Sequence, residues 1–208
     1  LLALVGEYVG ADYAQAMVDA CRARFPSLQF VRSDAANMVE FQDASFDAMV
    51  FSFNGIDHLP DDATRTRGLR EAARILRPGG RLVFSSHNAG QLFVWPQLRS
   101  AGLWRTPWRI VRAVVRSLVV AARTVFSGVY FRGEGYVDDP VHGGVRIYAS
   151  TPLTMAPQLL AAGFDIMEIV RGPERGTPLD CMASWHYYVC ERRSVEFEQL
   201  DDNQNGGD

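Results

Sequence analysis

Short apolar runs alternate with helical stretches in the first half of the chain. Residues 8–12, 30–34 and 46–52 are apolar runs with the length of strands, and a fourth run opens after Pro78-Gly79-Gly80. Strands that alternate with helices indicate a parallel sheet that helices cover on both faces. The fold class that we expect is therefore α/β, a doubly wound and mostly parallel sheet.

Two helices between these strands are defined by their apolar positions and their ends. The first shows the spacing of one helix face in Ala14, Met17, Val18 and Cys21. Asp12 and Gln15 at its start form a capping-box pattern. The second covers residues 61–76, and its apolar stripe is Leu69, Ala72, Ala73 and Leu76. Pro78-Gly79-Gly80 ends it, because proline cannot continue a helix and glycine accepts a left-handed turn.

The pattern changes in the second half. Residues 89–135 are rich in aromatic side chains and arginine, and we expect a lid-like helical insertion with a helix over about 107–126. Sheet building then resumes with a helix and two strands, over residues 151–162, 164–170 and 185–190, the last expected to be antiparallel. We expect one domain over residues 1–195 and a disordered acidic tail over 196–208.

Composition narrows the class of protein. With 208 residues, 48% hydrophobic and 22% charged, the chain suits one soluble domain. A net charge of −3 gives no reason to expect nucleic acid as a partner. Three cysteines without paired spacing indicate reduced thiols in a cytoplasmic protein, and four separated histidines predict no metal site. No apolar run is long enough to span a bilayer.

Two carboxylates stand where predicted strands end. Asp12 follows the first strand and Asp34 the second, and sheets of this kind bind ligands at the carboxyl ends of their strands. With the Gly10-Ala11-Asp12-Tyr13 run and the Pro78-Gly79-Gly80 join, these acids resemble the class I (Rossmann-like) S-adenosylmethionine-dependent methyltransferases. The resemblance covers residues 8–192, with 89–135 poorly matched.

The resemblance implies an enzyme that transfers a methyl group from S-adenosylmethionine and leaves S-adenosylhomocysteine. Asp12 would accept the ribose hydroxyls, Tyr13 and Met17 would pack on the adenine, and Asp34 with the backbone of Ala35 would receive the adenine amino group. The alternatives are that Asp12 caps its helix, Met17 belongs to the core, and Asp34 binds its own backbone in a turn. The acceptor would be a small molecule or a saccharide- or lipid-linked metabolite, methylated on oxygen rather than nitrogen or carbon.

The segment after the third strand lies where the family borders the sulfonium and the acceptor. Phe51, Ser52 and Asn54 are therefore candidate cofactor contacts. Asp57 and His58 are the candidate general bases, since histidine titrates near neutrality. The alternative is that His58 has no catalytic role, because alignment alone can accelerate methyl transfer.

Further candidates are expected on the acceptor side. His87 and Asn88 follow the fourth strand, and His142 in a later loop is a weaker candidate. Arg109 belongs to an arginine stripe of the expected insertion helix. The stripe would be a solvated face, a site for an anionic acceptor, or, through residues 104–126, a peripheral contact with a membrane. The sequence does not predict an oligomeric state.

One departure from the family concerns the start of the chain. The family has a strand and a glycine-rich turn before the strand at Tyr8, and Leu1 to Gly6 do not match them, so we expect an amino-terminally truncated methyltransferase. One rival is a non-catalytic relative that binds a membrane or a partner. The other is a nicotinamide-dependent dehydrogenase, against which stand the Pro78-Gly79-Gly80 join and the absence of lysine for a Tyr-x-x-x-Lys pair.

Overall fold

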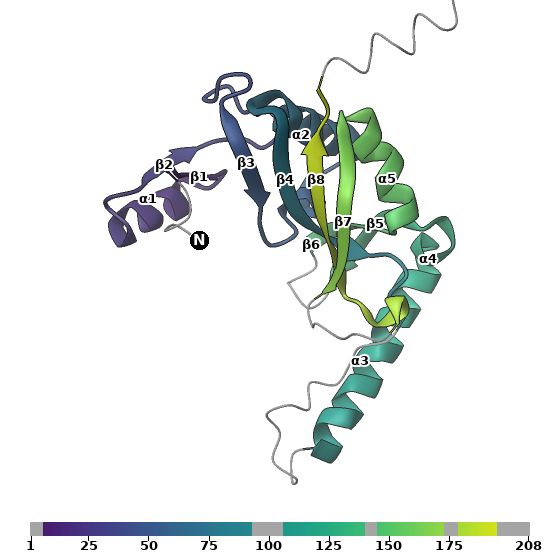
Figure 1. The fold of residues 1–208 in the computed structure, drawn as a ribbon. Coiled ribbons are helices and arrows are strands. Elements are labelled where there is room, and N and C mark those ends of the chain that lie inside the picture. Colours follow the sequence, from purple (N-terminus) through teal and green to yellow (C-terminus); the bar gives the residue numbers. More distant parts are fainter. Residues whose placement is uncertain (1–5, 93–105, 140–144, 173–178, 195–208) are drawn as a thin grey trace, which may run out of the picture.

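A strand–helix–strand unit opens the fold, as the apolar pattern predicted. The computed structural model describes residues 6–92, 106–139, 145–172 and 179–194. The unit comprises β1 (Val9–Asp12), α1 (Gln15–Arg24) and β2 (Gln29–Arg32). The two strands pair in parallel and form a sheet of their own, at one side of the molecule (Figure 1).

Among the described residues, the main sheet has six strands in mixed orientation. They are β3 (Phe46–Phe51), β4 (Leu76–Asn88), β5 (Glu134–Asp139), β6 (Val145–Ser150), β7 (Phe164–Gly172) and β8 (Trp185–Arg192). The order is β5-β6-β4-β8-β7, with β3 also on β4. β4 pairs in parallel with β3 and β6, while β8 runs antiparallel to β4 and β7. The α/β class and the antiparallel last strand are confirmed, but the sheet is mixed.

Two helices cover one face of this sheet. They are α2 (Asp62–Ile75) and α5 (Pro152–Ala161). Their apolar side chains meet those of β4 and β8 in one core cluster that includes Leu69, Ala72, Leu82, Phe84, Met155, Leu159 and Tyr188. Asp61 caps α2 by accepting the backbone N–H of Thr64 at 2.7 Å. Gly79, with φ of +77°, turns the chain at the start of β4.

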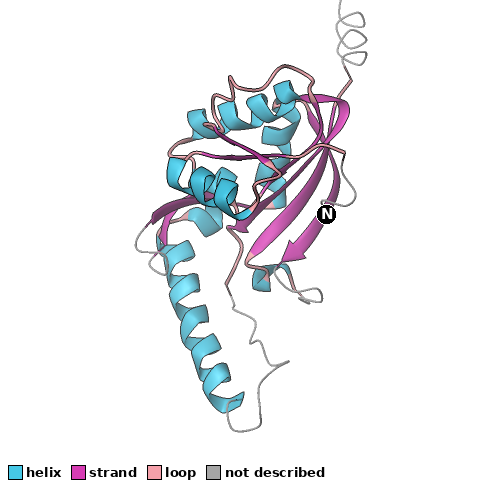
Figure 2. Ribbon diagram, turned by 90° about the vertical axis from the view of Figure 1, so that its left-hand side faces the viewer, coloured by secondary structure: helices cyan, strands magenta, loops and turns pink. Residues whose placement is uncertain are grey.

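The opposite face of the main sheet is less covered than a doubly wound fold predicts. Figure 2 shows helices gathered on one side of the strands. Within the described ranges, Val50, Val170 and Tyr187 remain exposed on this face. An open sheet face with polar groups at one end can bind a ligand.

The third long helix, α3 (Thr106–Phe126), extends away from the sheet (Figures 1 and 2) and leads into the short α4 (Val129–Arg132). Its bounds agree with the helix predicted over 107–126. The hairpin of β5 and β6, which packs a second small core cluster around Ile147, was not predicted.

Several local predictions were wrong. The capping box at α1 is absent: Ala14 is the N-cap, and Asp12 Oδ1 instead accepts the Ala14 N–H at 2.8 Å within a turn. Met17 is 52% exposed, so it does not belong to the core. Residues 85–88, predicted to leave the fourth strand, continue it to Asn88 because β8 pairs with β4 as far as His87.

The three cysteines differ in burial, and this predicts their reactivity. Cys190 is fully buried, and burial raises its pKa to about 12, whereas Cys21 and Cys181 are partly exposed. Since the thiolate is the nucleophile, Cys190 bears almost none of it at pH 8. Ellman's reagent should label two thiols quickly and the third on unfolding. Equal labelling rates for all three in the native protein would contradict this packing.

Candidate functional site

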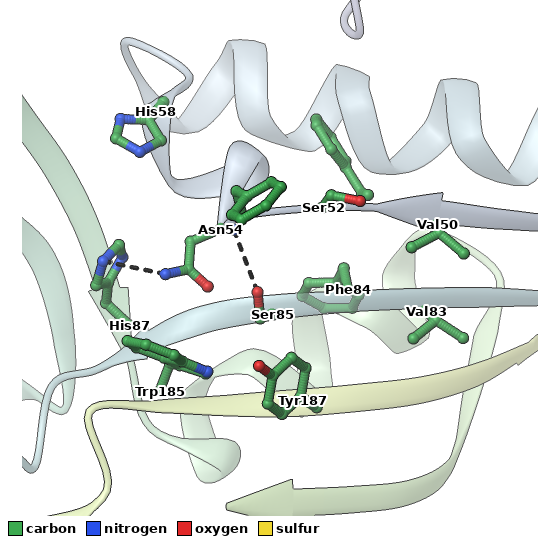
Figure 3. A pocket seen from close by; sticks show the side chains of 12 residues that line it. Val50, Ser52, Asn54, His58, Val83, Phe84, Ser85, His87, Trp185 and Tyr187 are labelled. Carbon is green, nitrogen blue, oxygen red and sulfur yellow. Dashed lines mark hydrogen bonds between the residues drawn. The ribbon is translucent and has the colours of Figure 1, made fainter. Parts of the chain in front are cut away.

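A pocket of about 640 Å³ opens at the carboxyl ends of β3 and β4 (Figure 3). It is lined by Val50, Phe51, Ser52, Phe53, Asn54, His58, Val83, Phe84, Ser85, His87, Trp185 and Tyr187. Alternation along the strands explains part of this set, because side chains two residues apart share a face. Ser85 and His87 of β4 thus stand opposite Tyr187 and Trp185 of β8.

The topology of the sheet creates this opening. β3 pairs with β4 as far as Phe51 opposite Phe84, and β6 pairs with the end of β4 at His87 and Asn88. After Phe51 the chain no longer pairs with β4 and forms the 3-10 helix η2 (Gly55–His58), whereas β6 pairs with β4 only from His87 onward. Such divergence points at the carboxyl ends of strands are where α/β sheets bind ligands.

The turn between β3 and η2 is conformationally strained. Phe53 and Asn54 both have a φ of 54°. This is the left-handed region of the backbone, which residues other than glycine and asparagine rarely adopt. The backbone N–H of Asn54 donates to Ser85 Oγ at 3.2 Å, which fixes the turn on β4. Backbone strain of this kind gathers at functional sites, where the surrounding structure holds it.

Behind the pocket wall, Asp57 is completely buried beneath His87. Its Oδ2 accepts the His87 backbone N–H at 2.6 Å and lies 2.7 Å from His87 Nδ1. Its Oδ1 accepts the hydroxyl of Ser86 at 2.8 Å. Burial raises the pKa of Asp57, and the hydrogen bonds from His87 and Ser86 oppose that shift. The carboxylate therefore orients the histidine and does not itself face the pocket.

The two predicted general bases thus differ in position. His58 lines the pocket, and its ring centroid is 6.4 Å from that of His87. Asp57 reaches the pocket only through His87, which the sequence had assigned to the acceptor side. The site brings Asp57, His58 and His87 together with Asn54, whose Nδ2 lies 3.2 Å from His87 Nε2.

The predicted adenosine contacts lie at the ends of β1 and β2. Asp12 is exposed beside Tyr13 and Met17, which are 69% and 52% exposed. Asp34 is exposed next to Ala35, and its Oδ1 accepts the Ala36 N–H at 2.9 Å, so the turn bond considered from sequence does form. Each carboxylate retains a second oxygen as an acceptor, so the groups present fit a ribose and an adenine amino group.

Three remaining candidates lie elsewhere. Asn88 is buried, and its Nδ2 donates to the carbonyls of Asp180 and Ala183, so it anchors the 3-10 helix η5 (Asp180–Met182). Arg109 lies on α3 and does not line this pocket. His142 falls outside the described residues. Among the residues that the structure describes, no cluster of three metal-ligating side chains is present.

The sequence did not single out seven of the lining residues: Val50, Phe53, Val83, Phe84, Ser85, Trp185 and Tyr187. Their common signal is alternation on neighbouring strands, with the tight turn after β3. The alternation across β4 and β8 is not visible until their pairing is known, because that pairing joins residues about a hundred positions apart.

Replacing Phe53 with glycine should stabilise the protein by roughly 0.5–1 kcal/mol. An L-residue in the left-handed region costs roughly 1–2 kcal/mol, and the added chain entropy of glycine offsets roughly 0.5–1 kcal/mol of the relief. Phe53 is 93% exposed, so little burial is lost. Urea unfolding should show a higher midpoint with an unchanged slope, whereas a lower midpoint would contradict the strain.

Comparison with known proteins finds similarity to methyltransferases over part of the chain. Residues 1–84 match the family described as "Methyltransferase domain". A demethylmenaquinone methyltransferase of Beutenbergia cavernae is 40% identical over 77 residues, which cover 37% of this chain and 30% of the relative. Another, from Corynebacterium kroppenstedtii, is 33% identical over 120 residues, covering 56% and 49%. The chain thus matches less than half the length of these relatives.

The fold agrees with this match. An S-adenosylmethionine-dependent methyltransferase from Mesorhizobium loti superposes with a TM-score of 0.60 at 18% identity, over 90% of this chain and 81% of that one. At this identity the likeness concerns the fold. The chain therefore carries a methyltransferase-domain sequence in residues 1–84 and has the fold of the class I S-adenosylmethionine-dependent methyltransferases.

Proposed function

We propose that the protein transfers a methyl group from S-adenosylmethionine to a small-molecule acceptor. The observation that carries this proposal is the position of the pocket. Its turn, Phe51 to Asn54, lies within the matched segment and meets the histidine-bearing end of β4. When bound, the cofactor supplies a methyl group that its sulfonium has already activated, so the residues have mainly to align the acceptor.

The cofactor would be held by residues of two neighbouring strand ends. In this proposal Asp12 accepts the ribose hydroxyls and Tyr13 and Met17 cover the adenine with their exposed apolar surface. Asp34 and the backbone of Ala35 receive the adenine amino group. Phe51, Ser52 and Asn54 border the reacting end of the cofactor, because they line the pocket.

The acceptor is proposed from the pocket walls. Val50, Val83, Phe53, Trp185 and Tyr187 make these walls largely apolar, while the polar groups gather at one end (Figure 3). This favours an acceptor with an apolar ring or chain over a free saccharide. The name of the relatives, demethylmenaquinone methyltransferase, is consistent with an acceptor of that kind.

Calorimetric titration of S-adenosylhomocysteine tests the cofactor site. Asp12→Ala should weaken binding by roughly 10- to 100-fold, because hydrogen bonds to a charged group contribute about 1.5–3 kcal/mol. Asp19→Ala is the matched control, since Asp19 is an exposed acid on α1 outside the proposed site. Equal affinities for the wild-type protein and Asp12→Ala would remove Asp12 from the site. Failure of the folded protein to bind would contradict the proposed function.

A second proposal concerns α3, which we infer to rest on an anionic membrane surface. One side of the helix exposes Trp108, Val111, Val114, Val115, Leu118 and Val119. Arg112 and Arg116 are exposed along the border of this apolar side, and no acidic residue occurs between residues 91 and 133. An apolar face edged by arginine suits the boundary between headgroups and acyl chains. Within the described ranges, no helix has both the length and the apolarity needed to cross a membrane.

Vesicle sedimentation with phosphatidylserine-containing liposomes tests this contact. The double variant Arg112→Ser/Arg116→Ser should lower binding by about 30-fold at low salt, since each arginine near an anionic surface contributes about 1 kcal/mol. Arg67→Ser/Arg70→Ser removes the same charge from α2 and should bind as the wild type does. Equal loss in both variants would show that net charge, and not α3, determines binding.

A further inference from the structure

His87 has the surroundings of a base whose proton is fixed on one nitrogen. Asp57 is the only carboxylate in hydrogen-bond contact with it within the described part of the chain, 2.7 Å from Nδ1. A carboxylate can only accept, so Nδ1 donates and the neutral ring keeps its lone pair on Nε2. The Ser86 hydroxyl and the His87 backbone N–H also donate to Asp57, one to each oxygen, so the carboxylate cannot rotate freely.

Nε2 lies on the pocket side of the ring. His87 is the more accessible partner of the pair, with 22% of its side chain exposed against none for Asp57. The Asn54 amide nitrogen lies 3.2 Å from Nε2 and donates to it on the pocket side of the ring (Figure 3). His58 and Tyr187 are the other titratable side chains of the pocket wall. Since Asp57 holds the opposite nitrogen, His87 rather than His58 is oriented by a buried partner.

A second observation points to a ligand at this end of the pocket. Asn54 is more than nine-tenths buried, and its Oδ1 has no hydrogen-bond partner among the described residues. The amide oxygen lies among His87, Ser85 and Trp185 in Figure 3. A buried acceptor without a partner is unfavourable, so a ligand that brings a hydrogen-bond donor would complete it. The site thus offers Nε2, which a ligand hydroxyl can reach by replacing the Asn54 N–H, and a second acceptor at Asn54 Oδ1.

We propose that His87 is the catalytic base of methyl transfer, that Asp57 is its positioning residue, and that the acceptor is a flat ring bearing two neighbouring hydroxyl groups. This inference rests on the proposed function. One hydroxyl gives its proton to Nε2 as its oxygen bonds to the methyl carbon. The bond between that carbon and sulfur breaks, and its electron pair stays on sulfur, which becomes the neutral thioether. The imidazolium that results faces the Asp57 carboxylate. The second hydroxyl donates to Asn54 Oδ1, and the apolar walls hold the ring.

The ionisation of a chromophoric probe, 4-nitrocatechol, tests the base. Bound to the wild-type protein at a pH where the free probe is neutral, it should show the absorption band of its phenolate. The band should be lost with His87→Gln and kept with His58→Gln. The proposal would be overturned if the phenolate band were lost with His58→Gln or kept with His87→Gln. It would also be overturned if the probe did not bind to a protein that binds S-adenosylhomocysteine.

The tautomer of His87 tests the role of Asp57 without any ligand. Long-range ¹H–¹⁵N spectra, assigned with His87→Gln, should show Nδ1–H in the neutral wild-type ring and a shift toward Nε2–H in Asp57→Asn. A wild-type Nε2–H tautomer would overturn the positioning role, even if the buried variant does not fold. S-adenosylhomocysteine titrated into the same samples should bind wild type and His87→Gln equally. If the wild-type protein does not bind S-adenosylhomocysteine, the proposed function is contradicted. The tautomer and the probe, by contrast, report on the base.

Discussion

The burial of Asp57 is the constraint on which the site depends. A carboxylate without solvent contact must be matched by donors, because an unpaired buried charge is strongly unfavourable. Here the donors come from two consecutive residues of β4, Ser86 and His87. They reach Asp57 only because η2 follows β3 across the end of β4. The orientation of His87 therefore depends on both the pairing of β3 with β4 and the strained turn that follows β3.

That arrangement also explains why the pocket has two kinds of wall. The side of β4 that carries Leu82 and Phe84 packs against α2 and α5 in the core, and Phe84 also reaches the pocket wall. The alternate residues Val83, Ser85 and His87 face the pocket. Alternation thus gives one strand both a structural and a chemical face. The polar residues Ser85 and His87 lie toward the carboxyl end of β4, beyond the part of the strand that carries the core residues Leu82 and Phe84.

Local patterns predicted most elements but not the way in which they assemble. The apolar stripes and the Pro78-Gly79-Gly80 join located α2, and the bounds of α3 agreed to within one residue at its start. The β5–β6 hairpin was missed because it lies in a stretch read as an insertion and the following turn. The mixed orientation of the sheet depends on pairing between distant segments, which no local pattern contains.

The site was predicted in part for the same reason. Asp57 and His58 were recognised as residue types suited to proton transfer and His87 as a residue of the acceptor side, but their roles depend on which of them is buried. Trp185 and Tyr187 were invisible as site residues until β8 was seen beside β4. Asn88 illustrates the opposite error, since its side chain points to η5 and not to the pocket.

Hydrogen–deuterium exchange measured with and without S-adenosylhomocysteine locates the cofactor on the chain. With the cofactor bound, we expect slower exchange in three separate segments, at the ends of β1, β2 and β3 around Asp12, Asp34 and Asn54. Protection at these three segments together would place the cofactor across the strand ends. Unchanged exchange there, or protection confined to α3, would contradict a cofactor site at these strand ends.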